Sequence, residues 1–301
     1  MAKRSSPKRS ENVESRVLVE TAFGLARSLD ITKLVVQADE FPDIFSVESV
    51  RETERVIWLT RKEEPLPLKH KSDDYQLRLP ETALTRMSQL KIGLMLAVTN
   101  EYIDLDETVL CLSGVAGSER LDTLLIANPR RDFPWFRNRK SGEIRRLVAT
   151  RELARIIDVS LRLAAEGREG RPIGTIFVLG DPEQLQFHIR QLVLNPCEGH
   201  PQRERNIHSP GFFETIREFA ALDGAFVIDK KGVVRSAGTY LDAPIKKAKL
   251  QAGLGARHAA ALSITAVTDA LATVVSSSSG TVTIFHEGKP ILELERVQGR
   301  Q

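Results

Sequence analysis

Apolar residues follow two different spacings along the first half of the chain. Helical spacing occurs over residues 17–26 and 85–97, whereas short continuous apolar runs occupy residues 33–37, 55–60 and 108–113. Such runs are typical of strands that are buried on both faces, and these strands occur in parallel sheets covered by helices. Residues 13–128 are therefore expected to form an α/β domain with a mostly parallel sheet.

The second half of the chain predicts a mixed sheet. One amphipathic helix is expected from Ser141 to about Gly167, and a second begins at Asp181-Pro182, where an acidic cap precedes proline. Further helices are expected at 212–221 and 259–270. The apolar runs predict strands at 173–179, 225–228, 233–241, 273–276, 282–285 and 291–294, the last three forming an antiparallel meander. Residues 141–301 are therefore expected to form a mixed-sheet α/β domain.

Two polar segments lie outside these domains. Residues 1–12 carry lysines and arginines among serines and have no apolar period, so they predict a disordered basic tail, with a nucleic-acid-binding arm as the alternative. Residues 129–140 are rich in arginine and predict a linker, in which Phe133, Trp135 and Phe136 are expected to pack between the domains.

Composition narrows the possible classes of protein. The chain has 301 residues, of which 42% are hydrophobic, enough for two domains with cores. No apolar run approaches the ~20 residues of a membrane span, so a soluble cytoplasmic protein is expected. The net charge of +3 does not indicate a nucleic-acid partner. Cys111 and Cys197 are far apart in sequence and form no CxxC pair, which speaks against a zinc ribbon.

Asp223 stands at a position suited to chemistry. An Asp-Gly pair usually marks a turn, but Asp223-Gly224-Ala225 joins a predicted helix directly to a wholly apolar strand. The carboxylate is therefore expected at a fixed strand entrance, where it could hold a divalent cation or accept a proton from a hydroxyl group.

A glycine-rich loop predicts a phosphate site. Residues 253–255 open a helix of small residues, and the first backbone N–H groups of such a helix have no partner within it. Arg257 and His258 stand at its mouth, where a guanidinium can bind phosphate oxygens and an imidazole can donate or ligate. Lys246, Lys247 and Lys249 lie just upstream, either as a solvated loop or as further charge for phosphate.

Two other candidates have weaker patterns. The loop Gly114–Arg120 has GxxG spacing and could bind an anion, although a surface turn is the favoured interpretation. The long loop 195–210 contains Cys197, His200 and His208, which could ligate a metal, but their irregular spacing favours ordinary surface residues.

Taken in order, several short motifs resemble the diadenylate cyclase (DAC) domain family. They are Asp223-Gly224-Ala225, Ser236–Leu241, Gly255-Ala256-Arg257-His258, Val267–Ala270 and Val274–Ser276. The resemblance extends over about residues 144–294, and the ordered set is more specific than any one motif. The preceding domain, above all residues 104–126, loosely resembles the C-terminal domain of pyruvate kinase, as in one subgroup of the family, which suggests a regulatory or dimerising role.

The resemblance implies an activity and a set of site residues. Two cyclase domains would face each other in a homo-oligomer, each holding one ATP, and would make the second messenger cyclic di-AMP and two pyrophosphates with Mn²⁺, Mg²⁺ or Co²⁺. Asp223 would bind the metal. The implied catalytic residues are Asp223, Gly224, Ala225, Arg257 and His258. The implied ATP-binding residues are Gly238, Thr239, Tyr240, Leu241, Gly255, Ala256, Arg257, His258, Ser276 and Ser277.

This chain departs from the family pattern at positions that bear on the chemistry. Ala259 replaces a basic residue that often follows Arg-His, Ala256 replaces a threonine, and Leu222 replaces a histidine. Serines at 277–279 stand where the family usually has acidic residues. These changes keep a second hypothesis open, in which the fold is a non-catalytic sensor of ATP or cyclic di-AMP.

Overall fold

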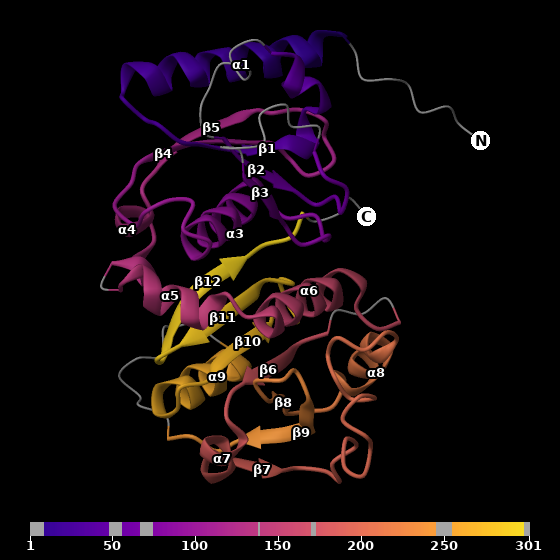
Figure 1. Cartoon of the computed structure of the whole chain (residues 1–301). Coiled ribbons are helices and arrows are strands. Elements are labelled where there is room, and N and C mark those ends of the chain that lie inside the picture. Colours follow the sequence, from indigo (N-terminus) through magenta and orange to yellow (C-terminus); the bar gives the residue numbers. More distant parts are fainter. Residues whose placement is uncertain are drawn as a thin grey trace, which may run out of the picture. The chain divides into compact units, whose positions relative to one another are not determined.

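The computed structural model describes residues 9–47, 56–66, 75–137, 139–169, 173–244 and 255–297. The chain forms two compact units (Figure 1). The first unit comprises Met1–Ala149 and Val297–Gln301, and the second comprises Thr150–Arg296. The division between the units falls after Ala149, so residues 129–140 belong to the first unit. The linker role predicted for them stays a prediction.

The first unit contains a five-stranded sheet in the order β3-β2-β1-β4-β5. Strands β1, β2, β3 and β4 run parallel to one another, and β5 runs antiparallel to β4. The mostly parallel sheet expected from the apolar runs is confirmed, whereas the sequence did not predict β3 and β5, which lie at its edges. The strands are β1 (Leu34–Gln37), β2 (Val56–Thr60), β3 (Tyr75–Arg78), β4 (Val109–Ser113) and β5 (Thr123–Ala127).

Helices cover both faces of this sheet (Figure 1). Helix α1 packs its apolar stripe, including Ala22 and Phe23, on Val36, Trp58 and other residues of the sheet. Side chains alternate along a strand, so the neighbouring Leu59 faces the opposite side, where it meets Gly93 of α3. Among its described residues, the helices of the first unit are α1 (Arg9–Ser28), α3 (Arg86–Thr99), α4 (Pro129–Asp132) and α5 (Ser141–Val148), with short 3₁₀ turns at Ala38–Glu40, Pro42–Ser46 and Pro134–Phe136.

Part of the segment predicted as a disordered tail, residues 1–12, is helical. Helix α1 begins at Arg9, so residues 9–12 of the predicted tail are helical. Residues 1–8 lie outside the described residues. At the other end of the chain, the N–H of Val297 donates to the carbonyl of Ala83 at 2.9 Å, within the first unit.

The second unit contains a seven-stranded mixed sheet in the order β12-β11-β10-β6-β8-β9-β7. Only β6 and β8 pair in parallel among these strands, and the closing meander of β10, β11 and β12 is antiparallel as predicted. The mixed-sheet α/β fold is therefore confirmed. The strands are β6 (Thr175–Leu179), β7 (Ile189–Gln191), β8 (Ala225–Ile228), β9 (Val234–Leu241), β10 (Leu271–Val275), β11 (Val282–His286) and β12 (Lys289–Leu294).

Helix α9 packs on one face of this sheet. Its buried residues Ala261, Leu262 and Ile264 meet alternate residues of β6, β8 and β10, including Val178 and Val274. The side chains between them point to the opposite face, where the rings of Phe177 and Phe226 stack at 5.1 Å. The helices of the second unit are α6 (Arg151–Glu166), α7 (Pro182–Leu185), α8 (Phe212–Phe219) and α9 (Ala256–Val267), with a 3₁₀ turn at Gln186–His188.

The single helix expected from Ser141 to Gly167 is wrong. The structure has two helices, α5 and α6, separated at Ala149 and Thr150. The hydroxyl of Thr150 accepts the N–H of Leu153 at 3.2 Å, which is the bond of a helix N-cap. The backbone of Thr150 is extended, as is usual for an N-cap, and so it interrupts the helix. The apolar pattern alone does not reveal this interruption.

In the part of the chain that the structure describes, no helix is both long enough and apolar enough to span a bilayer. The expected cytoplasmic location stays a prediction.

Candidate active site

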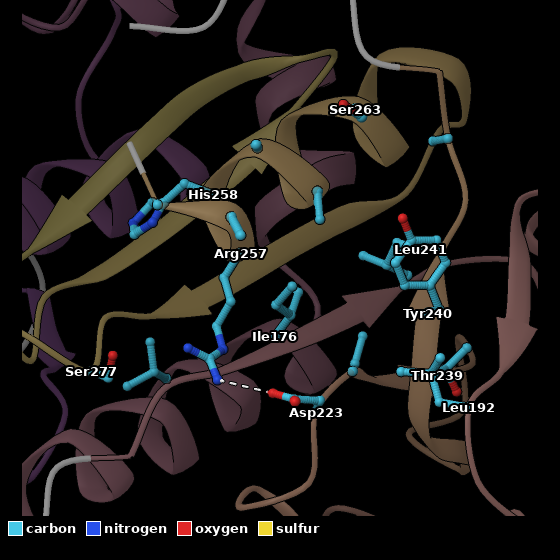
Figure 2. Close-up of a pocket in the computed structure, with 18 of the residues that line it drawn as sticks. Ile176, Leu192, Asp223, Thr239, Tyr240, Leu241, Arg257, His258, Ser263 and Ser277 are labelled. Carbon is cyan, nitrogen blue, oxygen red and sulfur yellow. Dashed lines mark ion pairs between the residues drawn. The ribbon is translucent and has the colours of Figure 1, made fainter. Parts of the chain in front are cut away.

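A cleft of about 800 Å³ opens in the second unit between the start of α9 and the strands β8 and β9 (Figure 2). It brings together segments that are far apart in sequence, including the turn before β8, the end of β9 and the turn after β10. All of the predicted site residues except Gly238 line it. These are Asp223, Gly224, Ala225, Thr239, Tyr240, Leu241, Gly255, Ala256, Arg257, His258, Ser276 and Ser277.

Asp223 is presented by a close approach between two strands. Gly224 has φ +114°, and a Cβ on it would lie 2.6 Å from backbone atoms of Gly238 and Thr239. Only glycine fits there, because the left-handed conformation and the neighbouring backbone both exclude a side chain. The preceding carboxylate is thereby fixed at the entrance of β8, with its side chain 94% exposed. It is accessible to a ligand in the cleft.

The first turn of α9 supplies hydrogen-bond donors. Gly255 is the N-cap, with extended backbone and no side-chain cap, and the first intrahelical bond runs from the N–H of Ala259 to the carbonyl of Gly255 at 3.1 Å. The N–H groups of residues 256–258 have no carbonyl to pair with inside the helix. They border the cleft at the positive end of the helix dipole, an arrangement that favours anions.

Arg257 points from this turn toward Asp223 (Figure 2). Its Nη2 lies 3.8 Å from Oδ1 of Asp223, and both side chains are solvent-accessible, so the pair is loose. A Cβ on Gly174 would lie 3.0 Å from Nη1 of Arg257 and 2.9 Å from Cβ of Ser277. Glycine at 174 therefore leaves room for the guanidinium beside the serine turn.

His258 is half-buried beside Arg257. Burial lowers the pKa of its imidazole from 6.5, and the carboxylate of Glu293 opposes that shift only in part. The ring meets Phe285 edge to face at 6.0 Å between centroids. Burial therefore favours the neutral imidazole, and among the described lining residues Arg190 and Arg257 carry the guanidinium charge of the cleft.

The structure adds cleft residues that the sequence patterns did not single out. Arg190 on β7 lines the cleft, and its guanidinium carbon lies 4.6 Å from the ring centroid of Tyr240. Ile176 and Ser263 line it as well. Strand β7 is a three-residue edge strand, too short for a recognisable pattern. Gly238 lies outside the lining and contributes its carbonyl, which accepts the N–H of Leu192 at 3.2 Å.

The loop Gly114–Arg120 is not open to a free anion. The carboxylate of Glu40 accepts the N–H groups of Gly117 and Ser118 at 2.9 Å and of Glu119 at 3.2 Å. Arg61 also donates to it at 2.9 Å. The anion bound by this loop is thus a side chain of the same chain.

The metal hypothesis for the long loop has no support. Within the described residues no three His, Cys, Asp or Glu side chains gather as a metal site, and Cys197 is a buried free thiol. Lys246, Lys247 and Lys249 lie outside the described residues, as do Gly253 and Leu254.

Comparison with known proteins gives concordant matches. The family described as DAC, DisA bacterial checkpoint controller nucleotide-binding, matches residues 162–290. A diadenylate cyclase of Methanocaldococcus jannaschii is 32% identical over 233 residues, or 77% of this chain and 70% of the relative. A diadenylate cyclase of Haloferax volcanii is 30% identical over 211 residues, or 69% and 75%. A crystal structure titled as a hypothetical membrane spanning protein from Bacillus cereus is 23% identical, with a TM-score of 0.36, over 50% of this chain and 64% of that chain. A TM-score this low does not establish a shared fold.

Proposed function

This chain belongs to the diadenylate cyclase family, and we propose that it condenses two ATP molecules into cyclic di-AMP and two pyrophosphates as a second-messenger synthase. One observation carries the proposal. A single cleft joins an exposed carboxylate, an anion-binding helix N-terminus with an arginine, and a wall of small and apolar side chains. These are the groups needed to accept a proton, to hold phosphates and to receive a base.

The reaction joins two nucleotides in two equivalent steps. The 3′-hydroxyl of each ATP attacks the α-phosphorus of the other, a new P–O bond forms, and the bond to the pyrophosphate breaks. Asp223, exposed at the cleft entrance, would accept the hydroxyl proton. The rest of the rate would come from holding the reacting atoms in line.

The phosphates would lie at the start of α9. The free N–H groups of its first turn and the guanidinium of Arg257 would bind the triphosphate and stabilise the charge that develops on the leaving pyrophosphate. Ala259 also lines the cleft, at the position where the family often has a third basic residue. Arg190 is a cleft guanidinium that could replace part of that charge.

The donor set fits a divalent cation carried by the substrate. Asp223 is the acidic residue among the described residues that line the cleft, and ions such as Mg²⁺ are commonly held by one or two carboxylates together with substrate phosphates. Asp223 and the ATP phosphates would therefore hold Mg²⁺ or Mn²⁺. When bound, the cation would supply neutralisation of phosphate charge and would favour deprotonation of the hydroxyl.

We further propose that the active form is a homo-oligomer in which two cyclase units face each other. One cleft can hold one of the two ATP molecules, so the chemistry requires a second copy. The apolar patch formed by Leu192, Val193, Leu194 and Leu222 supports this arrangement, since all four residues are exposed. Leu192 lines the cleft, Leu222 directly precedes Asp223, Val193 and Leu222 both lie close to Gly238, and Leu194 follows Val193 in the chain. Such patches commonly mark protein interfaces.

A non-catalytic sensor of ATP or cyclic di-AMP is the second candidate. Ser277 and Ser278 line the cleft at positions where the family usually has acidic residues, which leaves Asp223 without a second carboxylate among the described lining residues. A sensor would bind the nucleotide through the same α9 turn and would release no pyrophosphate.

The first unit is proposed to be a regulatory or dimerising domain. Its loose resemblance to the pyruvate kinase C-terminal domain and its mostly parallel α/β sheet support this role.

The test is product formation by wild type and by Asp223→Asn. Purified full-length protein is incubated with ATP and Mg²⁺, Mn²⁺ or Co²⁺, and products are separated by chromatography with mass detection. We expect cyclic di-AMP from wild type and a loss of about 100-fold or more in Asp223→Asn. Because the Asp223 side chain is almost fully exposed, folding should be unchanged.

Glu198→Gln is the matched control, since Glu198 is an exposed carboxylate of the same unit in the loop 195–210, away from the cleft. Its turnover should equal that of wild type. Full turnover by Asp223→Asn would refute the role of the carboxylate. Nucleotide binding without product under any of the metals would leave the sensor as the function.

A further inference from the structure

The side of α9 that borders the cleft is built from small residues and ends in a serine. Ala256, Ala259, Ala260 and Ser263 line the cleft, and their spacing of three and four places them on one helix face. At a rise of about 1.5 Å per residue, Ser263 lies roughly 9 Å farther along the helix axis than Arg257. Figure 2 shows the two residues on α9, with Ser263 well separated from the guanidinium.

The hydroxyl of Ser263 is buried without a hydrogen-bond partner in the part of the chain that the structure describes. The residue is 2% exposed, and among the described residues its Oγ makes no hydrogen bond. A buried hydroxyl that has lost its water without gaining a partner destabilises the fold, so its presence needs an explanation.

Other hydroxyls of this helix and of its C-cap form hydrogen bonds with nearby backbone groups. Thr265 donates to the carbonyl of Ala261 at 2.8 Å and accepts the N–H of Gly288 at 3.2 Å. Thr268 donates to the carbonyl of Ile264 at 2.7 Å. A bond of this kind to the preceding turn is a common solution for Ser and Thr in helices. Ser263 does not use it, and it is the hydroxyl of the three that lines the cleft.

We propose that Ser263 is a specificity residue whose hydroxyl hydrogen-bonds the edge of the adenine base of bound ATP. The proposal rests on the function proposed above. The phosphates occupy the start of α9, so the base must lie elsewhere in the cleft, and the walls available to it are Ile176, Leu241 and Ala260. A neutral hydroxyl that both donates and accepts matches a neutral base whose edge carries the N6 amino donor and the N7 acceptor.

The test measures nucleotide binding by the full-length protein, using calorimetry without divalent metal so that no turnover occurs. Ser263→Ala should bind ATP about 3- to 10-fold more weakly than wild type. Two analogues report the contact itself: 7-deaza-ATP, which lacks the N7 acceptor, and purine riboside triphosphate, which lacks the N6 amino group. One of them should bind wild type more weakly than ATP does, and that difference should disappear in Ser263→Ala.

Ser160→Ala is the matched control. Ser160 on α6 is also a fully buried serine of the second unit whose Oγ has no partner among the described residues, but it does not line the cleft. Its ATP affinity should equal that of wild type. Removal of an unpaired hydroxyl should leave the melting temperature of the nucleotide-free protein unchanged or higher in both variants.

Each remaining outcome overturns the inference. Equal ATP affinity in wild type and Ser263→Ala would show that the hydroxyl makes no contact with the nucleotide. A lower melting temperature in Ser263→Ala, with ATP and both analogues weakened by the same factor, would show a packing role. These results differ from failure of the proposed function, in which wild type would yield no cyclic di-AMP with any metal.

Discussion

At the scale of single residues, Glu40 is a carboxylate with no exposed surface that is held by several donors at once. Three backbone N–H groups of the loop 117–119 and the guanidinium of Arg61 converge on its two oxygens. Hydrogen bonds to a charged group each contribute about 1.5–3 kcal/mol, and breaking a buried ionic cluster costs more than any exposed pair. Glu40 therefore stabilises the end of the parallel sheet in the first unit.

Glu40→Gln removes the charge but keeps the size of the side chain. We expect the free energy of unfolding of the first unit to fall by about 2–4 kcal/mol, because the N–H groups lose an ionic acceptor and Arg61 loses a partner. Urea unfolding followed by tryptophan fluorescence measures this, since both tryptophans, Trp58 and Trp135, lie in the first unit. The exposed Glu119 of the same loop gives the control, Glu119→Gln, expected within about 0.5 kcal/mol of wild type. Equal midpoints for the two variants would contradict this role of Glu40.

At the scale of elements, the site depends on the contact between β8 and β9. The pairing of Ala225 with Thr239 brings the turn at Asp223-Gly224 against the backbone of Gly238. A side chain at 224 would have to push β9 away or distort the turn. The position of the proposed catalytic carboxylate and the integrity of the sheet are therefore set by the same glycine.

Gly224→Ala tests this coupling. We expect a lower free energy of unfolding by about 1–3 kcal/mol, from the positive φ and the close backbone contacts, together with loss of most cyclase activity. Melting temperature and product formation are the two measurements. Gly142→Ala serves as control, because Gly142 lies in α5 and nothing stands within 4 Å of a Cβ placed there. A Gly224→Ala protein with wild-type stability and activity would show that β9 adjusts freely.

Much of this arrangement could be predicted from the sequence, and the failures have physical causes. Apolar runs located β8 and β9 because buried strands leave a strong pattern. Helix α9 was predicted from Ala259 but begins at Ala256, since extended backbone at Gly255 ends the loop and places Arg257 and His258 inside the first turn. The expected loop residues are thus helical, and their N–H groups and side chains face one cleft.

Other features leave no local pattern in the sequence. Arg190 reaches the cleft through β7, a three-residue edge strand whose place depends on pairing with β9. The Glu40 cluster joins residues far apart in the chain, so no spacing rule could find it. Ser263 stands out only because its hydroxyl has no partner among the described residues, and the sequence of a helix does not reveal which of its hydroxyls stays unpaired.

At the scale of the whole molecule, the proposed reaction between two bound ATP molecules would require two clefts to meet. The apolar patch of Leu192, Val193, Leu194 and Leu222 includes one residue that lines the cleft, Leu192, and Leu194 is 96% exposed. In a two-fold interface every residue of the patch is used twice, once from each copy. A charge placed within it should therefore affect association twice, while the fold of the single chain stays unchanged.

Leu194→Asp should weaken the oligomer roughly 100-fold, since burial of one leucine contributes about 1.5–3 kcal/mol and the interface contains two. Light scattering after gel filtration would show a smaller species. Cyclic di-AMP formation per mole should fall and should rise again with protein concentration, because ATP binding by each chain is kept. Phe187→Asp is the control, since Phe187 is an exposed apolar residue of the same unit that lines a different cleft. Unchanged mass and activity in Leu194→Asp would show that the copies do not associate through this patch. An active wild-type monomer would show that the reaction does not require two facing copies.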